Sequence, residues 1–114
     1  MTFLPKVLLH IKLPTRFNSL KRIPEEFFIE LEEKFLHEYN GYTRIVPPEK
    51  GAWVDKTDGK QYHDWSITYE IFIERKNFME NVEGKLSALI DDLKSKFKQK
   101  AIACYYHEII ASDF

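Results

Sequence analysis

The side chains best suited to hold a ligand are two aromatic rings, one carboxylate and two bases that the predicted strands bring to one end of a sheet. They are Lys12, Arg16, Trp53, Tyr62 and Asp64. The rings offer a flat apolar surface, and the loop of residues 14–22 carries three basic residues and no acidic one. A local excess of positive charge attracts anions, so we expect any small ligand at this place to be anionic.

The carboxylates of Asp55 and Asp64 would permit general acid–base catalysis if one of them were withdrawn from water. On this alternative the chain is a small enzyme that uses Asp64, with Tyr62 or His10, on an anionic metabolite held at the hairpin end of the sheet. Carboxylates near a turn are more often plain surface groups. A solvated sheet face with cross-strand aromatic pairs, or a dimer interface, produces the same alternation, and the sequence favours these simpler interpretations.

Other chemistries lack the residues that they need. The sequence has four histidines and one cysteine, but no spacing typical of a set of metal ligands. His10 and His63 are expected on opposite faces of the sheet, so their imidazoles do not converge. The four glycines form no phosphate-binding loop, and Ser66 lacks the flanking glycines of a nucleophile elbow. We therefore expect no metal and no cofactor.

The elements that position these residues follow from the periods of their apolar side chains. Alternation predicts strands, and spacings of three and four predict helices. Pro24 suits a first helical position, and Asn40-Gly41 suits a helix end. The predicted elements are a strand at 6–13, a helix at 24–39, extended segments at 42–46 and 51–54 on either side of Pro47-Pro48, a strand at 61–74, a helix at about 79–99 and a strand at 101–110.

Asp58-Gly59 between two extended segments predicts a hairpin with a two-residue turn. In that register Thr57 pairs with Lys60, and Trp53 lies opposite Asp64. Residues that lie opposite one another share a face of the sheet.

The two tryptophans are expected on opposite faces of this hairpin. Trp53 shares the face of Tyr62 and Asp64, whereas Trp65 shares the other face. We therefore expect Trp65 to lie in the core and Trp53 to be more exposed.

The order strand, helix, strand, strand, helix, strand predicts an α+β protein of the ferredoxin-like βαββαβ type, as a single domain over residues 1–114. Right-handed crossovers give an antiparallel sheet in the order 4-1-3-2 with both helices on one face. The other face of the sheet is left open.

An open sheet face that carries Trp53, Tyr62 and Tyr105 resembles the aromatic patches found at interfaces. We therefore expect a small binding or interaction module that associates with itself through this face as a homodimer. Fold analogy cannot decide between this function and the small enzyme described above.

Composition bounds the partners and the location. Lys plus Arg is 17 and Asp plus Glu is 18, so a net charge of −1 gives no general attraction to nucleic acid. The predicted strand at residues 61–74 lacks the aromatic motif of RNA-recognition modules and carries Glu70 and Glu74. Apolar runs are far too short to span a bilayer, and Cys104 has no disulfide partner in the chain. We expect a soluble, cytoplasmic protein with no nucleic-acid and no membrane partner.

Four short segments carry a family resemblance, namely Asn40-Gly41-Tyr42-Thr43, Pro48-Glu49-Lys50-Gly51-Ala52-Trp53-Val54-Asp55, Gly59-Lys60-Gln61-Tyr62-His63-Asp64 and Phe97-Lys98-Gln99-Lys100-Ala101-Ile102. With these segments the chain resembles a group of small, uncharacterised bacterial proteins of about this length. The likeness spans most of the chain from Gly41 onward, but Tyr42 replaces a frequent second glycine and Lys100 replaces an acidic residue. The group has no assigned activity, so the resemblance implies a soluble protein of this fold and assigns no catalytic residue.

Overall fold

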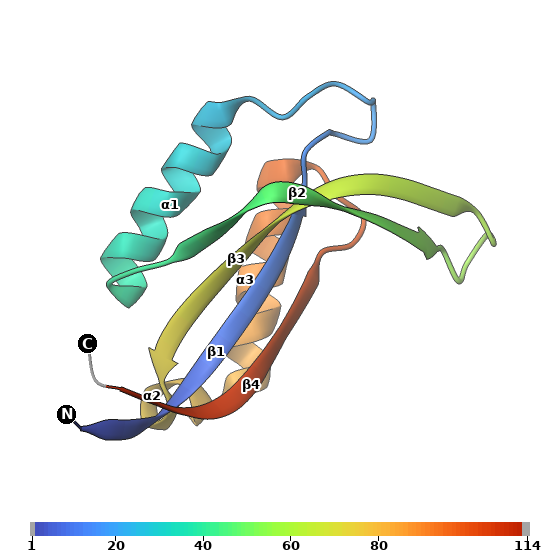
Figure 1. Ribbon diagram of the computed structural model, residues 1–114. Helices are drawn as coiled ribbons and strands as arrows, with labels where there is room; N and C mark the ends of the chain where they lie inside the picture. The colour runs from blue at the N-terminus through green and yellow to red at the C-terminus, as the bar shows by residue number, and fades with distance from the viewer. Residues whose placement is uncertain (1, 113–114) are drawn as a thin grey trace.

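Four strands form one antiparallel sheet in the computed structural model, which describes residues 2–112 (Figure 1). Within these residues the strand order is β2-β3-β1-β4, and the helices lie on one side of the sheet. This confirms the predicted ferredoxin-like fold and its strand order. The elements in chain order are β1 (Phe3–Pro14), α1 (Glu25–Tyr39), β2 (Thr43–Val54), β3 (Gln61–Glu74), α2 (Arg75–Met79), α3 (Val82–Phe97) and β4 (Ala103–Ser112).

The core lies between the helices and one side of the sheet, because alternate residues of the two inner strands are apolar. The residues between them point to the other side of the sheet, which we call the open face. The buried core side chains of these elements are Val7, Leu9, Ile11 and Leu13 of β1, Ile67, Tyr69 and Ile71 of β3, Phe28, Leu31 and Phe35 of α1, Phe78 of α2, and Leu93 and Phe97 of α3.

Helix α1 begins one residue after the predicted start and ends where the sequence predicts. Pro24 stands at its N-cap, and Glu25 and Glu26 lie in its first turn, where the helix dipole favours negative charge. At the other end Asn40 adopts a left-handed conformation with φ 64°, and its N–H donates to the carbonyl of Leu36.

Helix α3 confirms the predicted second helix at about 79–99, and a short helix that the sequence does not predict, α2, precedes it. Asn81 has a left-handed backbone with φ 57°, which interrupts the helical path between α2 and α3. The short α2 follows directly after β3, and it buries Phe78 with its ring centroid 5.4 Å from that of Tyr106. Helix α3 ends at Phe97 because Lys98 is also left-handed.

Strand β2 joins the two extended segments that the sequence predicts separately. Its pairing with β3 is irregular between Ile45 and Glu49, around a cis peptide bond before Pro47. An outer strand tolerates proline here because its outer edge joins no ladder.

The hairpin turn is longer than predicted. The Asp55 N–H donates to the Lys60 carbonyl, and the Gly59 N–H donates to the Asp55 carbonyl, with Gly59 at φ 73°. Trp53 therefore lies opposite Tyr62 rather than opposite Asp64. The register differs from the prediction by two residues, so each side chain keeps its predicted face but gains a different neighbour.

The prediction that Trp65 lies in the core is wrong. Trp65 is 52% exposed, whereas Trp53 is 36% exposed. Residues 49–54 of β2 and 61–66 of β3, which we call the hairpin arm, extend beyond the helices (Figure 1). Trp65 lies on the predicted side of the sheet, but the helices do not extend over the hairpin arm and so do not bury it.

Candidate functional site

The open face of the hairpin arm carries three of the five predicted ligand-binding residues. The rings of Trp53 and Tyr62 are stacked, with centroids 4.7 Å apart and planes at 16°. Asp64 follows on the same face of β3, opposite Gly51 of β2. Because Gly51 has no side chain, it leaves the side of the carboxylate that faces β2 uncrowded.

Asp64 is a half-buried carboxylate without a hydrogen bond or ion pair to any residue in the described range 2–112. Partial burial raises the pKa of Asp64, because desolvation disfavours the charged form. A carboxyl group with a raised pKa and a free position beside it is suited to accept a polar group of a ligand or to transfer a proton.

Lys12 lies further along the open face and is held by a small polar network. Its Nζ donates to Glu49 Oε1 at 3.0 Å and to Thr68 Oγ1 at 3.3 Å, and Thr68 Oγ1 donates to the same carboxylate oxygen at 2.7 Å. The Thr68 hydroxyl and the Lys12 ammonium lower the pKa of Glu49. The positive charge of Lys12 is therefore already neutralised by the Glu49 carboxylate.

Arg16 does not join the other predicted residues through its side chain. Its guanidinium donates to the carbonyl of Leu20 at 3.0 Å and so closes its own loop, which is also held by a backbone bridge between Arg16 and Arg22. The sequence prediction placed this loop at the correct end of the sheet, since the Thr15 N–H donates to the carbonyl of Trp65. Local hydrogen bonding nevertheless keeps the Arg16 charge within the loop.

Lys100 supplies the positive charge beside the aromatic pair. Its Nζ lies 3.5 Å from Asp55 Oδ2, and the neighbouring Tyr62 and Asp55 raise the pKa of Lys100. A backbone hydrogen bond from Thr57, together with Lys100, lowers the pKa of Asp55. Sequence reasoning missed Lys100 because it is 45 residues away from Asp55 along the chain, in the connection between α3 and β4.

A shallow hollow of about 530 Å³ lies at the turn end of the hairpin arm. Trp53, Lys100 and Ala101 are among the residues that line it. The turn residues complete it, and two of their backbone N–H groups are held by the carboxylates of Asp55 and Asp58. The hollow thus combines an aromatic surface, carboxylates and an ammonium group.

Aromatic side chains form a second cluster in the middle of the open face. The ring of His10 stacks on Tyr105 with centroids 4.6 Å apart, and His107 meets His10 edge-on at 5.2 Å. His10 Nε2 is buried and finds no hydrogen-bond partner among the described residues. In the same range, no group of three or more His, Cys, Asp or Glu side chains could hold a metal ion.

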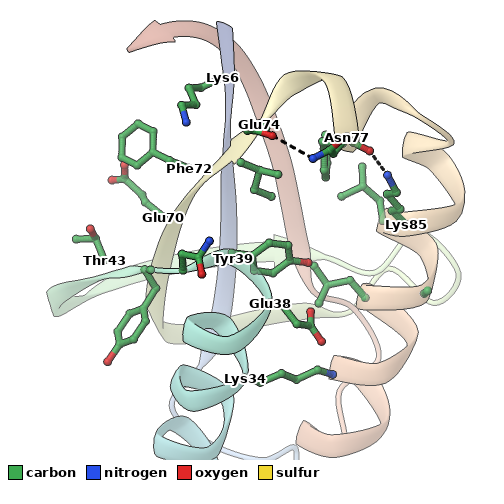
Figure 2. Close-up of a pocket in the computed structure, with 18 of the residues that line it drawn as sticks. Lys6, Lys34, Glu38, Tyr39, Thr43, Glu70, Phe72, Glu74, Asn77 and Lys85 are labelled. Carbon is green, nitrogen blue, oxygen red and sulfur yellow. Dashed lines mark hydrogen bonds between the residues drawn. The ribbon is translucent and has the colours of Figure 1, made fainter. Parts of the chain in front are cut away.

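A larger hollow of about 1010 Å³ lies at the other end of the sheet, where β3 extends past the first residue of β2 (Figure 2). It runs between α1 and α3, and the ion pair of Lys34 with Asp92, at 3.1 Å, lies on its lining. The other charged groups around it are of both signs, among them Lys6, Glu38 and Glu70. None of the predicted ligand-binding residues lines this hollow.

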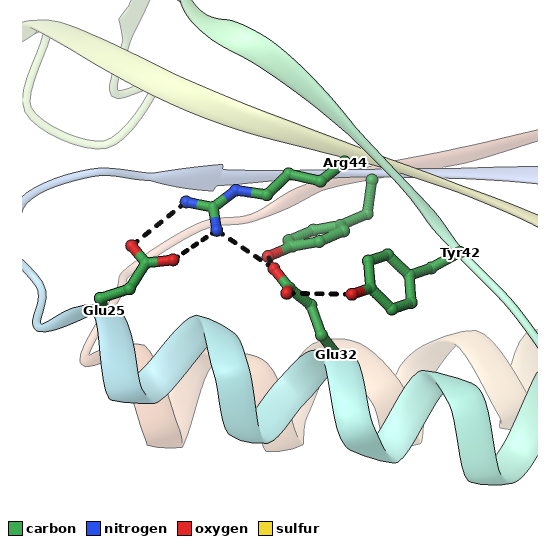
Figure 3. Close-up of polar contacts among 5 residues, drawn as sticks. Glu25, Glu32, Tyr42 and Arg44 are labelled. Carbon is green, nitrogen blue, oxygen red and sulfur yellow. Dashed lines mark hydrogen bonds and ion pairs between the residues drawn. The ribbon is translucent and has the colours of Figure 1, made fainter.

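A polar network beneath the sheet fastens α1 to β2 and β3 (Figure 3). Arg44 donates to Glu25 at 2.5 Å and to Glu32 at 3.2 Å, and Glu32 also accepts from the hydroxyls of Tyr42 and Tyr69. Tyr69 is fully buried, so this network is inaccessible to a ligand from that side and serves the packing of the helix.

Solved structures of the same fold include two kinds of protein. A phage SAM lyase in complex with S-methyl-5'-thioadenosine matches with a TM-score of 0.68 at 15% identity, over 94% of this chain and 85% of that chain. CutA1 from Oryza sativa matches with 0.61 at 14% identity, over 99% and 87%. The divalent cation tolerance protein CutA1 from Thermus thermophilus matches with 0.60 at 13% identity, over 95% and 87%.

At these identities the likeness shows a shared fold. No protein-family model and no curated protein matches the sequence. No helix among residues 2–112 is long and apolar enough to cross a bilayer.

Proposed function

We propose that the chain is a small binding module that associates with itself through the open face of its sheet. The observation that carries this proposal is the uncovered aromatic cluster in the middle of that face. Tyr105 is 42% exposed, and the His10 ring beneath it has a buried nitrogen without a partner among the described residues. A second chain packed on this face would cover the exposed aromatic rings.

The mixture of side chains on the open face suits a contact between folded chains. Leu8 and Ile109 are half-buried apolar groups near the cluster, and the Lys12–Glu49 pair lies to its other side. Interfaces between stable chains combine an aromatic and apolar centre with a polar margin.

Sedimentation velocity at micromolar concentration tests this proposal. The wild-type chain should sediment as an oligomer, and Tyr105→Ser should shift the distribution toward the monomer. Leu36→Ser is the matched control, because Leu36 is 51% exposed on α1, in the helix layer, and should leave the mass unchanged. A wild-type mass of 13.6 kDa, or equal effects of the two variants, would contradict the proposal.

A second candidate function is the binding of a small anionic ligand at the hairpin arm, with Asp64 available for proton transfer if the ligand is a substrate. The stacked pair of Trp53 and Tyr62 beside the ammonium of Lys100 favours it. An exposed ring face can stack on a base, and the ammonium can meet an anionic group. A nucleotide is a suitable probe, since the phage lyase of this fold binds a thioadenosine.

Thermal-shift and calorimetric titrations with adenosine 5'-monophosphate, and with S-methyl-5'-thioadenosine as its uncharged counterpart, test this second candidate. The monophosphate should bind more tightly, and both Trp53→Ala and Lys100→Ala should weaken it. Arg16→Ala is the matched control, because its guanidinium is bonded to the Leu20 carbonyl. No stabilisation by either compound, or loss of binding in Arg16→Ala alone, would remove the arm as the site.

A further inference from the structure

Strand β4 presents an unprotected sheet edge. It pairs with β1 along one side in a continuous register from Ala103 to Ser112, and no strand among the described residues pairs with its other side. Every second residue of such an edge leaves its backbone N–H and C=O groups without a ladder partner. These groups are what a further strand binds.

The sequence of β4 carries only one feature that usually protects an edge, the charge of Glu108, and Arg75 pairs with that charge. Natural edges carry lysine, proline or a bulge, which prevent the approach of another strand. Between Ala103 and Ser112 there is no proline, lysine or arginine, and the pairing with β1 has no register shift. The opposite edge of the sheet differs, because β2 contains Pro47, Pro48 and an irregular register.

We propose that β4 pairs antiparallel with β4 of a second copy of this chain, which joins the two sheets into one. This contact goes beyond the open-face association proposed above, because it uses the backbone of the edge and leaves the open face available. A contact of one edge with itself requires a twofold axis and a single self-complementary surface, the commonest arrangement among dimers.

Symmetry and charge select the register. A twofold axis normal to the sheet places one residue of β4 opposite its own copy, and the two longest such registers centre on His107 or on Glu108. Centring on Glu108 would put two carboxylates opposite one another, which is unfavourable. Centring on His107 instead places Glu108 opposite Tyr106, and Glu108 is already paired with Arg75.

In this register the side chains of β4 match those of the antiparallel β4 from the second copy. On the helix side of the sheet, Cys104 of one chain lies opposite Ile110 of the other, and on the open face Tyr105 lies opposite Ile109. Ile110 is 67% exposed in the single chain, and the pairing would give it an apolar neighbour. We therefore take a second copy, rather than an unrelated peptide, as the occupant of this edge.

Disulfide cross-linking tests both the contact and its register. Opposite residues in an antiparallel pair have Cα atoms about 4.5–5.5 Å apart, which is within disulfide reach. Ile110→Cys should therefore form a covalent dimer with the native Cys104 of the second copy when treated with oxidised glutathione. A bond within one chain is excluded, because the two positions are six residues apart along an extended strand, a distance of about 20 Å.

The matched control is Ile110→Cys combined with Cys104→Ser, which should give no covalent dimer although its thiol at position 110 is equally exposed. The oxidation is run at alkaline pH, since burial raises the pKa of Cys104 to about 11. Both positions lie on the helix side of the sheet, so packing of two open faces cannot bring them together.

The outcomes separate this inference from the proposed function. A covalent dimer of Ile110→Cys that the control lacks supports the edge contact. An oligomer by sedimentation without that cross-link overturns the edge contact but leaves open-face association standing. An edge cross-link together with an unchanged mass for Tyr105→Ser overturns open-face association alone, and a monomer under all conditions overturns both.

Discussion

Arg44 links α1 to the sheet through two carboxylates, and its surroundings decide how much that link contributes. The side chains of Arg44 and Glu32 are 23% and 14% exposed, so their charges are largely removed from water. Glu32 also accepts from Tyr42 and Tyr69, so that five polar side chains, Glu25 included, form one partly buried network. Removing one member of such a network leaves the partly buried polar groups that it contacts without a partner.

We expect Arg44→Ala to lower the free energy of unfolding by about 2–4 kcal/mol, because it leaves the Glu32 carboxylate without its cation. Lys34→Ala is the control, since the Lys34–Asp92 pair is about 40% exposed and should contribute less than about 1 kcal/mol. Urea denaturation of the two variants measures the difference. Equal losses would show that the Arg44 network acts as an ordinary surface pair.

Tyr69 makes stability depend on pH in the alkaline range. Burial, followed by the hydrogen bond to Glu32, raises the pKa of Tyr69 above the ordinary value of 10.0. The folded chain therefore keeps a proton that the unfolded chain releases near pH 10, so the stability present below pH 10 is lost as the pH rises further. Urea midpoints should fall between about pH 9.5 and pH 11.

Tyr69→Phe tests this assignment, although it also removes a hydrogen bond and will be less stable at neutral pH. The relevant measurement is the slope of unfolding free energy against pH above pH 10, which should be smaller in the variant than in wild type. An unchanged slope would assign the alkaline loss to other tyrosines, such as Tyr39 and Tyr42, whose pKa values burial also raises.

At the scale of elements, the hairpin arm is more exposed to solvent than the rest of the two strands that form it. The same β3 that buries Ile67, Tyr69 and Ile71 leaves Trp65 half exposed two residues before the first of them. The helices end before the arm does (Figure 1), so its stability comes from cross-strand pairs such as Trp53 with Tyr62.

We expect Trp65→Ala to cost no more than about 2 kcal/mol of unfolding free energy, because about half of the side chain is already in water. Phe35→Ala should cost about 3–5 kcal/mol, since Phe35 is 1% exposed beneath the sheet. Chemical denaturation of both variants gives the comparison. A Trp65→Ala loss as large as that of Phe35→Ala would mean that the arm is covered in solution, as it would be by a second copy.

At the scale of the whole molecule, both proposed contacts make folding depend on concentration. Association that occurs only between folded chains stabilises them by mass action. For a dimer, each tenfold increase in chain concentration contributes about 1.4 kcal/mol of association free energy.

The melting temperature of the wild-type chain should therefore rise with protein concentration, and differential scanning calorimetry over a hundredfold range measures it. Leu36→Ser should show the same rise. A melting temperature that is constant over this range would show that the folded chain is monomeric, in conflict with self-association through either surface.

The order of the four strands and the two long helices, the sheet topology and the sheet faces of the candidate site residues could be predicted from the sequence, whereas the short helix α2 was not. Side chains of a strand alternate strictly, and helical side chains repeat every three or four residues, so local patterns suffice for both. Lys12, Trp53, Tyr62 and Asp64 consequently lie on the predicted face of the sheet.

The tertiary structure decided the neighbours of those residues. Hydrogen bonds within the Asp55–Lys60 turn set the register that stacks Trp53 on Tyr62, and the length of the helix layer left Trp65 in solvent. The Arg16 side chain donates to the Leu20 carbonyl of its own loop, and Lys100 forms an ion pair with Asp55 although the two residues are far apart in the sequence. Alternation determines only which face a side chain occupies, whereas its contacts depend on turns and packing between segments far apart in the sequence.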